Sequence, residues 1–165
     1  MKGEIGMLYK NIMVAYDGSE PSTEALVVAK DMAGDDVEAT IHIVSIIPLG
    51  MAGVGIDSPV SPITGISQIF PDMEAYEVMM ENSRAQTVES MREQIGDMFN
   101  DVKCKVTIGA YASAKASTGI CDYAKEHEVD MIIMGRRGLG ALRAMMGSVS
   151  YAVLHESDIP VVTVK

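Results

Sequence analysis

Glycine and arginine are concentrated in one segment near the end of the chain, Met134–Ser150, which reads MGRRGLGALRAMMGSVS. It contains four glycines and three arginines in seventeen residues. No Asp or Glu occurs between Met131 and His155, although the chain has 23 such residues. Glycine allows the backbone to approach a ligand closely, and arginine adds positive charge. The composition therefore predicts a loop that binds an anion, most simply the phosphates of ATP.

The position of this segment favours the same chemistry. It follows a short apolar run, DMIIMG, that is typical of a buried strand, and it ends where a helix is predicted to begin, at Gly147-Ser148. The first amides of a helix lack internal partners, and the helix dipole attracts negative charge there. The hydroxyl groups of Ser148 and Ser150 are further candidate donors. A structural interpretation stays open, in which the glycines only turn the chain and Ser148 only caps the helix.

Other nucleotide and catalytic motifs do not fit the sequence. It contains no GxxxxGK[ST] loop, no GxGxxG after the first predicted strand, no HxGH, no SGGxDS and no GxSxG. His42, His127 and His155 are scattered and show no metal-ligand spacing. We therefore expect binding with at most slow hydrolysis, and no general base for water is identifiable.

Short apolar runs alternate with amphipathic segments along the chain. Strands are predicted at residues 11–16, 37–47, 102–109, 130–135 and 159–165, and helices at residues 19–34, 72–99, near 119–129 and at 148–157. Residues 110–118 are expected to form a variable connection. This alternation predicts an α/β fold, Rossmann-like, in which a parallel sheet lies between two helical layers as a three-layer sandwich. Ligands bind such sheets beyond the carboxyl ends of the strands, where the winding reverses.

Helix signals and apolar stripes refine these expectations. Ser19 is a predicted N-cap and Gly34 a predicted stop for the first helix. Three helices show a predicted inward face: Ala25, Val28, Ala29 and Met32 in the first; Met73, Tyr76, Met80, Val88, Met91, Ile95 and Met98 in the long one; and Val149, Ala152 and Val153 in the last.

Length and charge limit the classes of protein that fit. The chain has 165 residues, enough for a single domain over 1–165, and a net charge of −10, which disfavours binding to nucleic acid or to anionic membranes. No apolar run is long enough to cross a bilayer, and the N-terminus lacks the features of a secretory signal. Cys104 and Cys121 form no CxxC, which favours buried thiols in a reduced compartment. We expect a cytoplasmic protein.

Residues 48–71 interrupt the alternation. The segment contains four of the six prolines, four glycines and a single charged residue, Asp57. Two interpretations stay open: a flexible surface insertion, or a lid or partner-binding loop. Residues 1–8 are expected to form a short tail before the first strand.

Three segments together resemble the universal stress protein family: NIMVAYDGSEPSTEAL, MIIMGRRGLGALRAMMGSVSYAVL and DIPVVTVK. The resemblance covers residues 9–165 apart from 48–71 and 110–118. It implies a five-stranded parallel sheet in the order 3-2-1-4-5, usually in a homodimer. The ATP-binding members of the family carry a Gly-x2-Gly-x9-Gly-[Ser/Thr] signature. Gly135, Gly138 and Gly147-Ser148 match it, but eight residues rather than nine separate the second and third glycines.

The resemblance also implies a set of contacts to ATP, with or without Mg²⁺. The implied contacts are Ala15, Tyr16, Asp17, Ile43, Met134, Gly135, Arg137, Gly138, Gly147, Ser148, Val149 and Ser150. Asp17 would approach the ribose or a phosphate-bound metal, although from the residues alone it is equally an Asx-turn residue before Gly18-Ser19. Ile43 would meet adenine through its backbone. Tyr16 is bulky for its position, so its ring would pack on the base or narrow the pocket.

Three functional hypotheses follow. The leading hypothesis is a nucleotide-binding regulatory module of the stress response that acts on an unknown protein partner. The alternatives are a dimeric scaffold that binds no nucleotide, motivated by the shortened loop and Tyr16, and a slow ATP hydrolase. In each case the apolar terminal segment 159–165 is expected to lie at a sheet edge and to form a homodimer interface.

Overall fold

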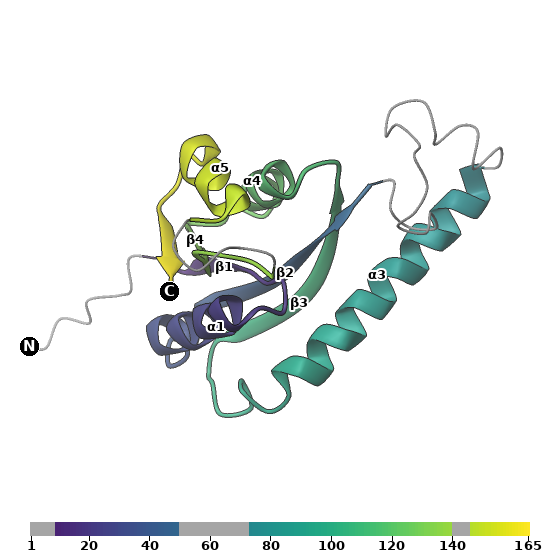
Figure 1. Cartoon of the computed structure of the whole chain (residues 1–165). Helices are drawn as coiled ribbons and strands as arrows, with labels where there is room; N and C mark the ends of the chain where they lie inside the picture. Colours follow the sequence, from purple (N-terminus) through teal and green to yellow (C-terminus); the bar gives the residue numbers. More distant parts are fainter. Residues whose placement is uncertain (1–8, 50–72, 140–145) are drawn as a thin grey trace, which may run out of the picture.

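The computed structural model describes residues 9–49, 73–139 and 146–165, and these form a parallel α/β sheet structure (Figure 1). The elements are β1 (Asn11–Ala15), α1 (Glu20–Ala33), β2 (Thr40–Pro48), α3 (Met73–Ile95), β3 (Lys105–Ser113), α4 (Ala116–Glu126), β4 (Met131–Gly135), α5 (Ser148–Glu156) and β5 (Val161–Val164). The five strands are parallel and lie in the order β3-β2-β1-β4-β5. The predicted fold class and strand order are confirmed.

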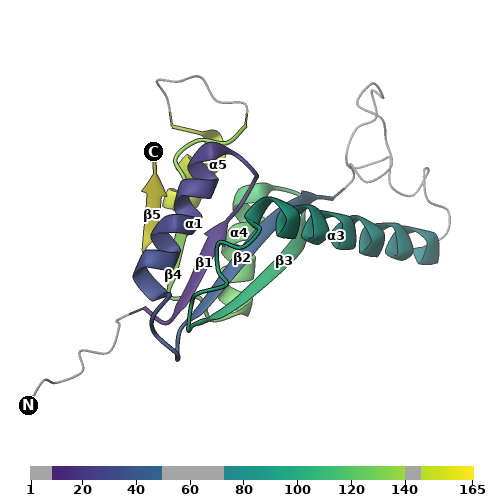
Figure 2. The same ribbon diagram turned by 90° about the horizontal axis from the view of Figure 1, so that it is seen from below.

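Helices cover both faces of the sheet (Figures 1 and 2). On one face, α1 and α3 enclose a core that includes Ile12, Leu26 and Ile41. On the other face, α4 and α5 enclose a second core that includes Met13 and Ile132. The strand β4 is buried along its whole length, as expected for a central parallel strand covered on both sides.

The beginning of α1 follows the predicted capping chemistry. Ser19 lies at the N-cap position in extended conformation, and its hydroxyl oxygen accepts a hydrogen bond from the amide of Ser22 at 3.3 Å. Pro21 lies in the first turn, where its missing amide proton is not needed. Of the predicted inward face, Ala25 and Ala29 are fully buried, and the helix ends before Gly34 as expected.

The predicted variable connection at 110–118 is wrong. β3 extends to Ser113, because residues Ala110–Ser113 pair in register with Ser45–Pro48 of the neighbouring strand. α4 begins at Ala116, only three residues after that strand ends. Pairing with a long neighbouring strand thus overrides the weak local signal of small residues here.

The long helix is shorter than predicted, and its first turns are more exposed. α3 ends at Ile95 because Gly96 adopts a left-handed conformation, with φ of 52°, that stops a helix. Met80, Met91 and Ile95 of the predicted stripe are buried, whereas Met73 is 69% exposed. In both views α3 continues past the edge of the sheet, so its N-terminal part has little sheet to pack against (Figures 1 and 2).

Other predictions fall partly or wholly outside the described residues. Pro48, assigned to the insertion 48–71, is the last residue of β2, and residues 50–72 lie outside the described ranges, as does the tail 1–8. Cys104 and Cys121 are free and buried, as predicted, and burial raises the pKa of both thiols. Among the described helices, none combines the length and apolar character needed to cross a membrane.

A histidine between the sheet and α4 gives the fold a predicted pH dependence. His42 Nδ1 lies 3.1 Å from the Tyr123 hydroxyl and 3.3 Å from Thr107 Oγ1, and the Tyr123 ring stacks on His127 with ring centres 3.8 Å apart. Burial lowers the pKa of His42 below its usual 6.5, and the nearby charges of His127 and Lys105 lower it further.

Because the unfolded chain binds this proton more readily than the folded one, the free energy of unfolding is expected to fall as the pH decreases below about 6.5. Urea unfolding of the wild type and of His42→Gln between pH 7.5 and 5 measures the effect, and the variant should lose part of the dependence. His155→Gln, changed at the exposed end of α5, is the matched control. Equal pH dependence in wild type and His42→Gln would contradict the prediction.

Candidate functional site

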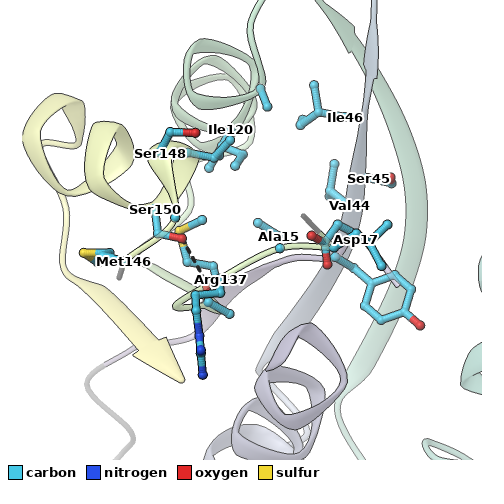
Figure 3. Close-up of a pocket in the computed structure, with 18 residues that line it drawn as sticks. Ala15, Asp17, Val44, Ser45, Ile46, Ile120, Arg137, Met146, Ser148 and Ser150 are labelled. Carbon is cyan, nitrogen blue, oxygen red and sulfur yellow. Dashed lines mark hydrogen bonds between the residues drawn. The ribbon is translucent and has the colours of Figure 1, made fainter. Parts of the chain in front are cut away.

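A pocket of about 640 Å³ opens at the carboxyl ends of β1 and β4. These adjacent strands mark the point where the sheet reverses its winding, since β2 and β3 extend to one side and β5 to the other. Figure 3 shows Asp17 and Val44 on one side of the hollow and Ser148 and Ile120 on the other. The lining consists of Ala15, Tyr16, Asp17, Val44, Ser45, Ile46, Ala116, Ile120, Met134, Gly135, Arg137, Gly138, Leu139, Met146, Gly147, Ser148, Val149 and Ser150.

Asp17 occupies the turn between β1 and α1. Its Oδ1 accepts hydrogen bonds from the amide of Ser19 at 3.0 Å and from the Ser19 hydroxyl at 2.6 Å. These hydrogen bonds give Asp17 the Asx-turn role that the sequence predicts as an alternative to ligand binding. Gly18 supports the turn with a φ of 79°. The same carboxylate also lines the pocket, through a second oxygen that faces Gly138. The turn therefore holds Asp17 at the pocket in a fixed orientation.

The glycine segment leads into α5 without a capping side chain. Gly147 is the N-cap residue, and its amide donates to the carbonyl of Arg136 at 2.9 Å. Ser148 is the first helical residue rather than the cap, so the interpretation in which it only caps the helix is wrong. The following amides at the start of α5 border the pocket at exposed Ser148 and Val149. A helix N-terminus in this setting is an attractive position for a negatively charged group.

Two residues of α5 differ from their predicted roles. The Ser150 hydroxyl is buried and donates to the carbonyl oxygen of Gly135 at 2.9 Å, which ties the first turn of α5 to the end of β4 (Figure 3). That proton is therefore engaged within the protein. Val149, predicted on the inner face, is 36% exposed, whereas Ser150 and Val153 are buried. The buried face of α5 therefore includes Ser150 and Val153, and Val149 lies outside it.

Glycine is required at two positions of the loop by close approach of neighbouring atoms. A Cβ atom at Gly138 would lie 2.5 Å from Asp17 Oδ2. A Cβ atom at Gly135 would lie 2.9 Å from Pro21 Cβ and 3.0 Å from the Arg137 carbonyl oxygen. A Cβ atom rarely lies this close to another heavy atom. Glycine at both positions therefore allows the loop to lie directly against the β1–α1 turn and α1.

The arginines of the loop contribute in different ways. Arg136 acts through its backbone: its amide donates to the carbonyl of Val164 at 2.6 Å, and its carbonyl accepts from Gly147. Its Nε is buried and has no hydrogen-bond partner among the described residues. Arg137 lines the pocket, but in Figure 3 its side chain extends away from Asp17 and Ser148. Arg143 lies outside the described residues.

The structure brings together eleven of the twelve predicted contact residues, and Ile43 is the exception. Ile43 is fully buried in the core on the α1 and α3 face, whereas the next residue, Val44, lines the pocket. Strand residues alternate between faces, so the Ile43 side chain lies on the opposite side of the sheet from that of Val44. The predicted contact of the Ile43 backbone with adenine stays a prediction. The Val44 carbonyl is itself engaged, because it accepts from the amide of Tyr16 at 2.9 Å.

The predicted role of the Tyr16 ring is not supported. The side chain is 5% exposed and belongs to the core on the α1 and α3 face. Its hydroxyl donates to Gln94 Oε1 of α3 at 3.0 Å. The ring therefore anchors the end of β1 to α3 and does not stack within the pocket.

The apolar part of the pocket wall was not predicted from the sequence. Val44, Ser45 and Ile46 come from β2, and Ala116 and Ile120 come from α4. Leu139 and Met146 flank the glycine segment. The β2 residues could have been found only from the register of the strands. Ala15 pairs with Val44, so both residues lie at the same height along the sheet. The contribution of α4 could not be found, because it depends on how the helix packs in the assembled fold. Ala116 also lies outside the helix predicted near 119–129.

The arrangement offers an apolar wall, one carboxylate and a helix N-terminus within a single hollow. This combination suits a ligand with a flat apolar part, a hydroxylated part and an anionic end. Within the described ranges, no cluster of three or more His, Cys, Asp or Glu side chains is placed to hold a metal ion.

A doubly wound α/β fold with a ligand-sized pocket at the switch point defines the structural class. The chain belongs to the universal stress protein family, whose model matches residues 8–165. It is 31% identical to universal stress protein YxiE of Bacillus subtilis over 96% of this chain and 100% of that one. It is 26% identical to universal stress protein MJ0531 of Methanocaldococcus jannaschii over 96% and 83%.

Two solved structures show the same fold. Protein MJ0577, the subject of a structure-based assignment of biochemical function, aligns with a TM-score of 0.70 and 25% identity over 97% of both chains. Universal stress protein UspA of Lactobacillus plantarum aligns with a TM-score of 0.66 and 20% identity over 95% of this chain and 98% of that one.

Proposed function

We propose that this universal stress protein binds ATP or a related adenine nucleotide in the switch-point pocket and acts as a regulatory module of the stress response. The observation that carries the proposal is the convergence of Asp17, Gly138 and the start of α5 on one pocket of about 640 Å³. That volume falls within the usual range of small-molecule sites, roughly 300–1,000 Å³.

Each part of the pocket suits one part of a nucleotide. Val44, Ile46 and Ile120 form an apolar wall for the base. Asp17, held by the Asx turn, is positioned to accept hydrogen bonds from ribose hydroxyl groups. The start of α5 at Ser148, together with the glycine segment, suits the phosphates. A universal stress protein of this fold, 16% identical to this chain, has been solved in complex with cAMP.

Magnesium would enter with the nucleotide rather than bind beforehand. Where Mg²⁺ is present, Asp17 Oδ2 would approach the metal instead of a ribose hydroxyl group, while Oδ1 stays in the turn. A single carboxylate is a weak site for Mg²⁺ but is sufficient when phosphate oxygens supply most of the remaining ligands. We therefore expect Mg²⁺ to strengthen ATP binding and to bind poorly alone.

Isothermal titration calorimetry of the full chain with Mg-ATP tests the proposal. We expect a saturable heat for ATP, because the pocket combines an apolar wall from β2 and α4 with the start of α5. Mass spectrometry of small molecules released from freshly purified protein is the complementary measurement. Absence of both heat and co-purified nucleotide would favour the alternative of a dimeric scaffold that binds no nucleotide.

We also propose that β5 forms a homodimer interface. It is an edge strand of four half-buried residues, Val161–Val164, paired with β4. On α5, the helix that precedes it in the chain, Tyr151 is 59% exposed and Leu154 is 43% exposed. An apolar edge strand is suited to pairing with a second copy.

Light scattering after size exclusion tests this interface. The wild type is expected to have twice the chain mass of 17.7 kDa. Val162→Lys places a charge in β5 and should produce monomers. Val106→Lys is the matched control, because Val106 is a partly buried valine of the opposite edge strand, β3. A monomeric wild type, or equal dissociation by both variants, would contradict the proposal.

A further inference from the structure

A hydrogen bond at the carboxyl end of the central strand β1 connects the pocket with the long helix α3. Tyr16 lies directly between the pocket residues Ala15 and Asp17, and its backbone amide donates to the carbonyl of Val44. Its side chain leaves the pocket on the opposite face and donates to Gln94 Oε1 at 3.0 Å. One residue therefore contacts both the ligand pocket and α3.

The two partners of this hydrogen bond differ in their surroundings, because Tyr16 is buried and Gln94 is exposed on α3. Tyr16 is 5% exposed and packs in the same core as Met91 and Ile95 of α3. Gln94 is held in turn, because its Nε2 donates to Ser90 Oγ at 3.1 Å. Gln94 Oε1 also lies 3.1 Å from the position that a Cβ atom would take at Gly18. A displacement of the β1–α1 turn would therefore change the contacts of the Gln94 side chain.

The anchoring of α3 is concentrated near this contact. The helix has 23 residues, a length of about 35 Å at 1.5 Å per residue. Met91 and Ile95 near its end are buried in the core on the α1 and α3 face. Nearer its beginning, Met73 and Val78 are 69% and 56% exposed, and Met80 is buried but is not part of that core. Figure 2 shows the first turns extending past the sheet. A helix anchored mainly at one end converts a small change at that end into a larger displacement at the other.

We propose that Tyr16 and Gln94 couple occupancy of the pocket to the position and stability of α3. The inference rests on the proposed nucleotide binding. A ligand that contacts Asp17 restricts the β1–α1 turn, and the turn restricts Tyr16. The Tyr16–Gln94 hydrogen bond is then more persistent, and the amides of α3 open less often. Tyr16 and Gln94 are thus coupling residues and make no side-chain contact with the ligand.

Hydrogen exchange of the full chain with and without saturating Mg-ATP tests the coupling, with calorimetry run on the same samples. In the wild type, ATP should slow exchange of the α3 amides by at least about fivefold, the lower end of typical coupling factors. Tyr16→Phe keeps the buried ring and removes only the donor. It should lose most of the exchange effect in α3. Retention of binding is judged on Gln94→Ala, because Gln94 lies outside the pocket lining, and this variant should bind ATP within about threefold of the wild type.

Gln94→Ala should reproduce the loss, and Gln86→Ala, an exposed glutamine on the same helix, should not. Binding of ATP to the wild type without any change in α3 would overturn the coupling while leaving the proposed function intact. An equal change in wild type and Tyr16→Phe would also overturn it. Absence of ATP heat in the wild type would overturn the proposed function and this inference together.

Discussion

Gly138→Val is expected to weaken Mg-ATP binding by about 100-fold, the largest effect of any single change in the pocket, while the protein stays folded. The first added carbon would lie 2.5 Å from Asp17 Oδ2, so the carboxylate must move away from its position at the pocket. Loss of a hydrogen bond between the ligand and the charged Asp17 carboxylate costs about 1.5–3 kcal/mol, and about 2.7 kcal/mol corresponds to 100-fold in affinity. Calorimetry measures the change.

The effect is expected in binding rather than in folding, because Gly138 is exposed and the nearest obstacle is a side chain rather than backbone. The urea midpoint should therefore stay close to that of the wild type. Gly109→Val is the matched control, since a Cβ atom there meets no atom within 4 Å and the residue lies in β3, outside the pocket lining. Unchanged ATP affinity in Gly138→Val would show that the ligand does not depend on the Asp17–Gly138 contact.

The elements of the fold that carry strong local signals were predictable from the sequence. The buried strand β4 reads as an uninterrupted apolar run, and α1 carries both an N-cap serine and a first-turn proline. Where these signals are weak, neighbouring structure decides. The extension of β3 to Ser113 depends on pairing with β2, and a single segment of sequence cannot show which strand will lie beside it.

The candidate site divides in the same way. Residues contiguous with a motif, such as Asp17 after β1 and Gly138 after β4, were identified because the chain itself places them at the strand ends. Val44 and Ile120 were missed because they reach the pocket through register and helix packing, which are properties of the assembled fold. The position of Ile43 illustrates the sensitivity of such assignments: a shift of one residue exchanges the pocket face for the opposite core.

The glycines of the signature meet two different physical requirements. Gly138 leaves room for the Asp17 side chain at the pocket, whereas Gly135 leaves room for Pro21 at the start of α1. The amide and carbonyl groups around Gly135 are all part of the scaffold, since Ser150 donates to its carbonyl and Arg136 pairs with Val164. We therefore expect substitutions at these two glycines to have separable consequences, one for binding and the other for stability.

Gly135→Ala is accordingly expected to lower the free energy of unfolding by about 2–3 kcal/mol, toward the upper end of the cost of overpacking. The added methyl group would lie 2.9 Å from Pro21 Cβ and 3.0 Å from both the Pro21 carbonyl carbon and the Arg137 carbonyl oxygen. Two of these three atoms are backbone, so relief requires a shift of α1 or of the loop rather than a rotation of one side chain. Urea unfolding measures the loss, with Gly109→Ala as the control that adds the same methyl group in open space. A stability equal to that of the control would mean that α1 can retreat from β4 at little cost, and the close packing of Pro21 on Gly135 would then have no structural importance.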